Sequence, residues 1–212
     1  MLESRFGSLQ VAWSASQSEL ATAGLDRGVV ASLVEHRTDV DPQREIDRIH
    51  AAGVTVLTWH DSNYPMLLRE VDDLPPILYA RGPIGATKTV TVVGTRKPTA
   101  YGREVAKHLS GELAEAGVTI VSGMARGVEG IAHRTALEAG GRTLAVLGCG
   151  VDVAYPPEHA SLIAQIVEQG AVISEYPLGT KPEERHFPRR NRLLSGLSVA
   201  TLVIEAGEGS GP

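Results

Sequence analysis

Three stretches of this chain combine the residue types that bind phosphate groups. The first is Gly94-Thr95-Arg96, which follows the apolar, β-branched run 89–93 and comes just before a helical pattern. A strand that ends at a helix N-terminus offers backbone N–H groups to an anion, and an arginine adds a planar set of donors. An ordinary strand-to-helix turn with a surface arginine would have the same residues, so the stretch favours anion binding but does not establish it.

The second stretch, Ser122-Gly123-Met124-Ala125-Arg126-Gly127, is a better candidate because a hydroxyl, glycines and an arginine follow another apolar run. It lacks the Gly-Lys-Ser/Thr ending of a P-loop, and its glycines do not have the spacing of the dinucleotide fingerprint. Glu129 and His133 then lie four residues apart on one face of the predicted helix. They could position a ligand, or they could serve only the helix itself.

The third stretch runs from Lys181 to Arg192 and is the densest group of cations in the chain. It contains one aromatic ring, Phe187, among five basic side chains and two glutamates. Cations for phosphates and a ring for base stacking suit a single-stranded nucleic acid. A solvated helix start is the usual alternative for such a run, but this one directly follows a predicted strand.

Other kinds of site find little support in the sequence. Cys149 is the single cysteine, so no internal disulfide can form, and its place between two glycines indicates a structural residue. The seven histidines have no metal-ligand spacing such as His-Glu-x-x-His, and no Ser-His-Asp arrangement can be read from their order. We therefore expect no metal, no cofactor and no catalytic residue.

Charge is distributed unevenly along the 212 residues, although the formal net charge is only −5. Residues 1–80 carry 6 basic and 12 acidic side chains, whereas residues 81–107 carry 6 basic and one acidic. A mildly acidic total therefore does not exclude an anionic ligand. No stretch approaches the roughly 18 apolar residues of a membrane span, and the N-terminus does not resemble a secretory signal. We expect a cytoplasmic protein with no membrane contact.

The elements that must position these stretches alternate regularly in residues 88–212. Continuous apolar runs are typical of parallel strands buried on both faces, and right-handed crossovers then give a doubly wound, Rossmann-like sheet. Because ligands bind at the carboxyl ends of such strands, the three stretches should meet at one edge. Strands are predicted over 89–93, 118–121, 143–147, 171–174 and 200–204, and helices over 101–116, 128–139, 157–169 and 188–196.

The preceding residues are predicted to form two further parts. Residues 1–53 have short helical patterns, with serines and Asp41 as N-caps, and indicate a small helical domain. Residues 54–87 read as an extended connecting segment with a strand over 54–59 and a short helix over 66–71.

Short motifs follow one another in an order typical of one protein family, and the similarity extends over most of the chain, from about residue 6 onward. They are Asp61–Pro65, Leu74–Gly82, Val92–Pro98, Ser122–Gly127, Ala132-His133, Tyr155-Pro156, Ser174-Glu175, Phe187–Arg192, and Glu205-Ala206 with Ser210-Gly211. In this order they resemble the DprA/Smf family of DNA-processing proteins of natural transformation.

The resemblance implies an extended Rossmann fold behind a small helical domain of the sterile-alpha-motif type. It also implies a homodimer that binds and protects incoming single-stranded DNA and loads RecA onto it, without catalytic turnover. Carried over by motif, the residues that contact DNA would be Gly94, Thr95, Arg96, Ser122, Gly123, Arg126, Lys181, Phe187, Arg189, Arg190, Asn191 and Arg192.

The chain departs from the family pattern at two places. Glu129 stands where the family usually has aspartate, which keeps the charge. The family also continues past Ser210-Gly211 into further elements, so we expect the Rossmann domain here to be incomplete at its C-terminal end, with an exposed strand.

Two enzymes remain as alternatives on related folds. A phosphoribohydrolase of the cytokinin-activating type would need Pro-Gly-Gly-x-Gly-Thr-x-x-Glu after the last strand, where this chain has Glu205 to Gly211 without the proline, the threonine or the spacing. A dinucleotide-dependent oxidoreductase would need the missing glycine fingerprint.

Overall fold

The computed structural model describes residues 1–85 and 88–207. The chain forms two compact units, Met1–Arg48 and Ile49–Pro212. In the first unit, short helices surround a small core in which Leu20 and Val30 are buried. Ser16 and Glu19 form a reciprocal capping box at the start of one of them, which satisfies N–H groups that a helix start leaves unpaired. The predicted helical N-terminal region is confirmed; its helices are α1 (Leu2–Phe6), α2 (Leu9–Ser14), α3 (Gln17–Thr22) and α4 (Arg27–His36), followed by α5 (Pro42–Ala51).

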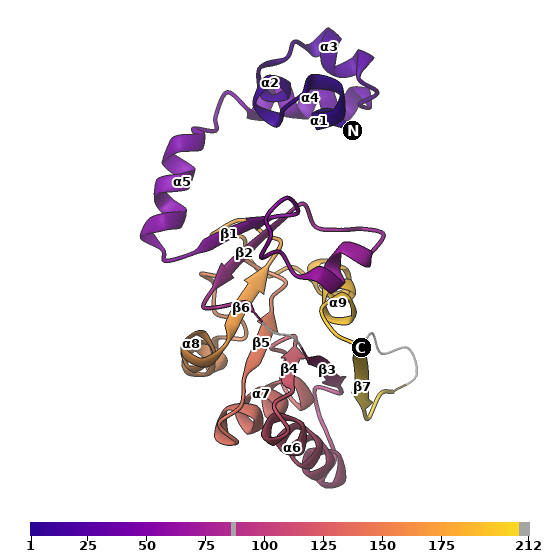
Figure 1. The fold of residues 1–212 in the computed structure, drawn as a ribbon, viewed down its shortest axis with the longest axis vertical. Helices are drawn as coiled ribbons and strands as arrows, with labels where there is room; N and C mark the ends of the chain where they lie inside the picture. Colours follow the sequence, from indigo (N-terminus) through magenta and orange to yellow (C-terminus); the bar gives the residue numbers. More distant parts are fainter. Residues whose placement is uncertain (86–87, 208–212) are drawn as a thin grey trace. The chain divides into compact units, whose positions relative to one another are not determined.

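The second unit is built on a sheet that has seven strands within the described residues (Figure 1). The strand order is β1-β2-β6-β5-β4-β3-β7, and every neighbouring pair from β6 to β7 is parallel. The predicted strands are confirmed to within two residues at each end. Their bounds are β3 (Thr89–Gly94), β4 (Thr119–Ser122), β5 (Thr143–Val146), β6 (Ala171–Ser174) and β7 (Ala200–Ile204).

The segment 54–87 does more than connect the two parts. It contributes β1 (Thr55–Thr58) and β2 (Ile77–Arg81), and β2 pairs antiparallel with both β1 and β6. Burial alternates along β2, with Leu78 and Ala80 fully buried, which is typical of an antiparallel strand near a sheet edge. The short helix η1 (Met66–Glu70) lies between the two strands. The sheet is therefore parallel from β6 to β7, as predicted, and β1 and β2 add an antiparallel edge that was not predicted.

Helices cover both faces of the sheet. Val92 and Ile120 pack with α6 (Ala100–Glu115) and α7 (Val128–Glu138), whereas the next residues, Val93 and Val121, pack with α9 (His186–Gly196). On the same face as α6 and α7, α8 (Ala160–Gln169) covers β5 and β6 and follows the short η2 (Pro157–His159). The chain thus changes face between β6 and β7, which places the switch point between β3 and β7, where ligands of such sheets usually bind.

The strand β7 forms one edge of the sheet in the described part of the chain. It pairs with β3 only, and its side chains are largely exposed; Val203, for example, retains 54% of its accessible surface. This is where the expected exposed strand lies. Among the described helices, none has the length and apolar character needed to cross a membrane.

Candidate nucleic-acid interface

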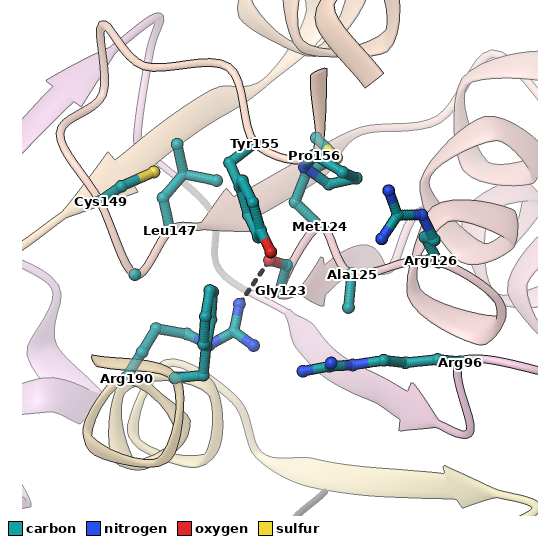
Figure 2. Close-up of a pocket in the computed structure, with 12 residues that line it drawn as sticks. Arg96, Gly123, Met124, Ala125, Arg126, Leu147, Cys149, Tyr155, Pro156 and Arg190 are labelled. Atoms are coloured by element: carbon teal, nitrogen blue, oxygen red, sulfur yellow. Dashed lines mark hydrogen bonds between the residues drawn. The ribbon is translucent and has the colours of Figure 1, made fainter. Parts of the chain in front are cut away.

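A small pocket lies at the carboxyl ends of β3, β4 and β5 (Figure 2). It encloses about 30 Å³, which is room for a water-sized group and not for a whole nucleotide. A nucleic acid would therefore contact its rim. The pocket brings together parts of all three predicted stretches, and its lining comprises Arg96, Gly123, Met124, Ala125, Arg126, Leu147, Gly148, Cys149, Tyr155, Pro156, Phe187 and Arg190.

The turn after β3 has its backbone groups occupied within the fold. The Thr95 N–H lies 3.3 and 3.0 Å from the carbonyl oxygens of Ile204 and Glu205, and the Thr95 carbonyl accepts the Val128 N–H. A side chain at Gly94 would collide with the Ile204 carbonyl. The backbone of Gly94 and Thr95 therefore shapes the turn, and the Thr95 hydroxyl accepts the Lys97 N–H at 3.2 Å. Contact of these two residues with an anion stays a prediction. From this stretch, Arg96 alone reaches the pocket.

The N-terminus of α6 holds a carboxylate of the protein itself. Glu205 accepts the Thr99 N–H at 2.8 Å and also the Thr99 hydroxyl, and Thr99 Oγ1 accepts the Gly102 N–H at 3.1 Å. The hydrogen bonds from the Thr99 side chain and backbone lower the pKa of Glu205. Its backbone is left-handed, with φ of 52°. The helix end that usually binds an anion is thus closed by the chain's own carboxylate.

The loop after β4 is held by contacts with the interior of the sheet and with the turn after β3. Ser122 is fully buried and its hydroxyl donates to the Val92 carbonyl inside the sheet, so the expected contact of Ser122 with an anion is not supported. Met124 has φ of 75°, which is uncommon for a residue with a side chain. Gly127 also has φ of 75°, and a Cβ there would collide with the Thr95 carbonyl and the Arg96 backbone. Gly127 thereby joins this loop to the turn after β3.

Arg126 is exposed on the rim but already has a partner. Its Nε donates to the Glu158 carboxylate at 2.5 Å, and both side chains are about half exposed. The pKa of Glu158 is lowered by hydrogen bonding to its own backbone N–H and then to Arg126. At neutral pH the pair is therefore ionised on both sides, and the charge of Arg126 is partly compensated.

Arg190 is buried and Arg192 is partly buried with acidic partners, although we expected both to contact DNA. Arg190 is 4% exposed, and its Nη1 donates to the carbonyls of Gly123 and Val146, the latter at 2.6 Å. Burial lowers the pKa of the Arg190 guanidinium, against the attraction of Glu129. Arg192 pairs with the carboxylates of Glu175 at 2.6 Å and Asp73 at 3.0 Å. The sequence could not distinguish these arginines from exposed ones, because their partners come from distant segments.

An aromatic pair adjoins the Arg96 side chain. The Tyr155 and Phe187 rings stack with their centroids 5.6 Å apart, and the Arg96 guanidinium lies 6.0 Å from the Phe187 centroid. Figure 2 shows Arg96 reaching into the pocket from the end of β3, with Tyr155 above it. The sequence patterns gave Tyr155 no role. The sign that could have identified it is that Tyr155 is an aromatic residue in a loop at the carboxyl ends of the strands.

The remaining candidates lie outside the pocket lining. Lys181 and Arg189 are exposed, and Asn191 is half-buried. Cys149 lines the pocket floor as a buried thiol whose pKa burial raises to about 11, so the thiol is neutral at physiological pH, in keeping with a structural residue.

Comparison with known proteins identifies the family of this chain. Residues 55–212 match the family model of the DNA recombination-mediator protein A. The chain belongs to this family. Protein Smf of Synechocystis sp. is 39% identical to it over 99% of this chain and 54% of the relative. The chain thus spans about half the length of the curated relatives it matches.

Solved structures of this DNA recombination-mediator family share the fold. The X-ray structure of DNA processing protein A from Streptococcus pneumoniae has a TM-score of 0.79 and 31% identity, over 92% of this chain and 68% of that chain. A structure of DNA processing protein A from Helicobacter pylori, described by its single-stranded DNA binding mode, has a TM-score of 0.68 and 33% identity, over 74% of this chain and 72% of that one. The resemblance to the DprA/Smf family is confirmed. The predicted Rossmann-like sheet, which follows a helical region in the sequence, is confirmed as well.

Proposed function

We propose that this chain binds single-stranded DNA across the pocket rim, with Arg96 on a backbone phosphate and the Tyr155–Phe187 pair against a base. The observation that carries the proposal is the guanidinium of Arg96 beside the stacked rings at the carboxyl edge. A single strand presents both a phosphate and an unpaired base face, and such a site serves both with little dependence on sequence. Tyr155 is 36% exposed and so keeps ring surface available for stacking.

The interior of the site argues against a free nucleotide as the ligand. The pocket encloses about 30 Å³, and Glu205 already occupies the N-terminus of α6. A phosphoribohydrolase would need a glutamate available to the ribosyl bond after the last strand. Glu205, the glutamate there that the structure describes, is held by Thr99. Contacts at the rim fit a strand that passes over the surface.

Further cations extend the positive surface beyond the pocket. Lys97 follows Arg96 in the turn after β3, while Lys181 and Arg189 come from the segment after β6, and all three side chains are exposed. Because these segments follow the carboxyl ends of parallel strands, they lie at the same end of the sheet. The arrangement supports contact with several phosphates and not with one alone.

The family gives this binding a wider context. Relatives are named DNA processing proteins, and the Helicobacter pylori structure is described by single-stranded DNA binding. On this basis we propose a role in DNA processing during transformation, with delivery of the strand to RecA, as a homodimer in the cytoplasm and without catalytic turnover.

The test is the salt dependence of DNA binding, measured by fluorescence anisotropy with single- and double-stranded oligonucleotides. Affinity for the single strand should be higher and should fall linearly on a log–log plot against salt. Arg96→Ala should weaken binding and reduce the slope by about 0.7, the value for one phosphate contact in a single strand. Lys88→Ala is the matched control, because Lys88 comes just before β3, at the amino-terminal end of that strand. This variant also removes one positive charge, and it should leave the affinity within about twofold of the wild-type value. Binding that is insensitive to salt, or to Arg96→Ala, would refute the proposal.

A further inference from the structure

A buried ion pair lies beneath the rim of the pocket, outside the proposed DNA contacts. Arg190 of α9 and Glu129 of α7 are 4% and 6% exposed, and Arg190 Nη2 lies 3.8 Å from Glu129 Oε1. The two residues are far apart in sequence and come from helices on opposite faces of the sheet. Direct binding of DNA does not explain side chains buried so deeply.

Stability does not explain the pair either. Removing two charges from water is costly, and apolar residues of similar volume in place of such a pair are often neutral or stabilising. The Nε–H of Arg190 is buried and has no acceptor within residues 1–85 and 88–207, which adds to the cost. What the pair holds in place is therefore more informative than its own energy.

The two side chains hold the loop after β4 on both sides of Met124. Arg190 Nη1 donates to the Gly123 carbonyl, drawn as a dashed line in Figure 2, and to the Val146 carbonyl at the end of β5. Glu129 Oε2 accepts the Ala125 N–H at 2.6 Å. Met124 lies between these anchors with φ of 75°, and a left-handed methionine persists only where its surroundings hold it.

The same arginine also fixes α9 relative to that loop. Phe187 lies three residues before Arg190, so both are on neighbouring turns of one helix face. The Arg190 guanidinium occupies the space above Gly123, where a side chain would collide with it. The distance between the Phe187 ring and the loop that carries Arg126 therefore depends on this contact.

We propose that Glu129 and Arg190 are positioning residues, which hold the loop 123–127 and the start of α9 in the geometry that binds DNA, without touching the DNA themselves. The proposal rests on the proposed function, and it moves Arg190 from the DNA contacts to their support. It also gives Glu129 a role that the helix alone does not require.

The decisive variant is the double substitution Glu129→Leu with Arg190→Met, which removes both charges and leaves neither side chain buried as a lone ion. Affinity for single-stranded DNA should fall about tenfold while the salt slope stays unchanged, because the number of phosphate contacts is the same. Arg96→Ala should lower both. Without DNA, the Ala125 amide should exchange with solvent faster in the double variant, as seen by hydrogen exchange.

Leu57→Ala is the control for a general loss of stability, since Leu57 is buried in β1 and belongs to a hydrophobic cluster that contains no residue of the loop 123–127. It should lower Tm and leave DNA affinity unchanged. If the double variant does not fold, Glu129→Gln, which keeps an acceptor for Ala125 and removes the charge, should give a smaller loss of affinity with the same slope.

Two results would overturn the positioning role. A slope reduced by about 0.7 in the Arg190 variant would make Arg190 a direct phosphate contact. Unchanged affinity in a folded variant would make the pair merely structural. Failure of the proposed function looks different, because wild-type protein would then bind no single strand or would ignore Arg96→Ala.

Discussion

The turn after β3 and the loop after β4 are built alike and present their arginines differently. In each, a carboxylate of the chain itself accepts a backbone N–H that could have bound an anion, Glu205 at Thr99 and Glu129 at Ala125. Yet Arg96 lies over the Phe187 ring without a carboxylate partner among the described residues, whereas Arg126 is paired. The side chain across from each arginine, and not the strand-to-helix motif, distinguishes the two, and we expect Arg96 to be the more available to DNA.

The ion pair of Arg126 with Glu158 is weak enough for Arg126 to exchange its partner. Both side chains are about half exposed, so water and salt screen the pair and it adds little to stability. A phosphate could replace Glu158 at small cost. We therefore expect Arg96 to be the primary contact with DNA and Arg126 to be a secondary one.

The substitution with the largest expected effect is Gly127→Ala, because Gly127 lies where the loop after β4 packs against the turn after β3. Its φ of 75° with ψ of −127° suits glycine only, and a Cβ would meet the Thr95 carbonyl. We expect a loss of about 2–4 kcal/mol in the free energy of unfolding, measured by urea denaturation. Gly140→Ala is the matched control, because Gly140 has φ of 70° with no atom within 4 Å of the added Cβ, and it should cost about 1–2 kcal/mol. Equal losses would mean that the contact between the two connections is unimportant.

The next largest effect separates the two arginines directly. Arg96→Ala should weaken single-stranded DNA binding about ten- to a hundredfold, the range for loss of a charge-assisted hydrogen bond. Arg126→Ala should weaken it by less than about threefold, because its charge is already compensated. Both are measured by anisotropy at one salt concentration. Similar losses for the two variants would break the comparison.

A smaller effect, of opposite sign, is expected from Glu158→Gln. Removing this carboxylate makes Arg126 available, so affinity for single-stranded DNA should rise about two- to threefold. In the Glu158→Gln background, Arg126→Ala should then cost more than it does in the wild type, and a double-mutant cycle measures the coupling. No coupling between the two positions would show that Glu158 does not restrain Arg126.

The smallest effect concerns Glu205 and acid. Its folded-state pKa is lowered from 4.5 by the Thr99 hydrogen bonds, so its contribution to stability is present above about pH 4.5 and is lost as the pH falls through that lowered pKa. The difference in Tm between the wild type and Glu205→Gln should be constant from about pH 7 to pH 5 and should shrink toward pH 3. A difference that persists unchanged at about pH 3 would mean that charge on Glu205 does not stabilise the α6 N-terminus.

Local patterns were sufficient for most of the sheet, with one instructive exception. Runs such as Val90–Val93 and Ile120–Val121 are continuous and apolar because both faces are covered, and they identified the parallel strands. The strand β2 was missed as part of the same sheet because its partner, β6, lies more than 90 residues along the chain. The pairing of Tyr79 with Ser174 leaves no local trace in either segment.

The sequence by itself determined that the three candidate phosphate-binding stretches meet at one end of the sheet, since parallel strands with right-handed crossovers leave no other place for their carboxyl ends. Only the tertiary structure decided what each residue does there. Whether an arginine stays exposed or is held inside depends on the carbonyls and carboxylates that packing brings within hydrogen-bond distance. Arg96 and Arg190 are chemically the same, but Arg96 is exposed and lies beside the Phe187 ring, whereas Arg190 is buried against Glu129.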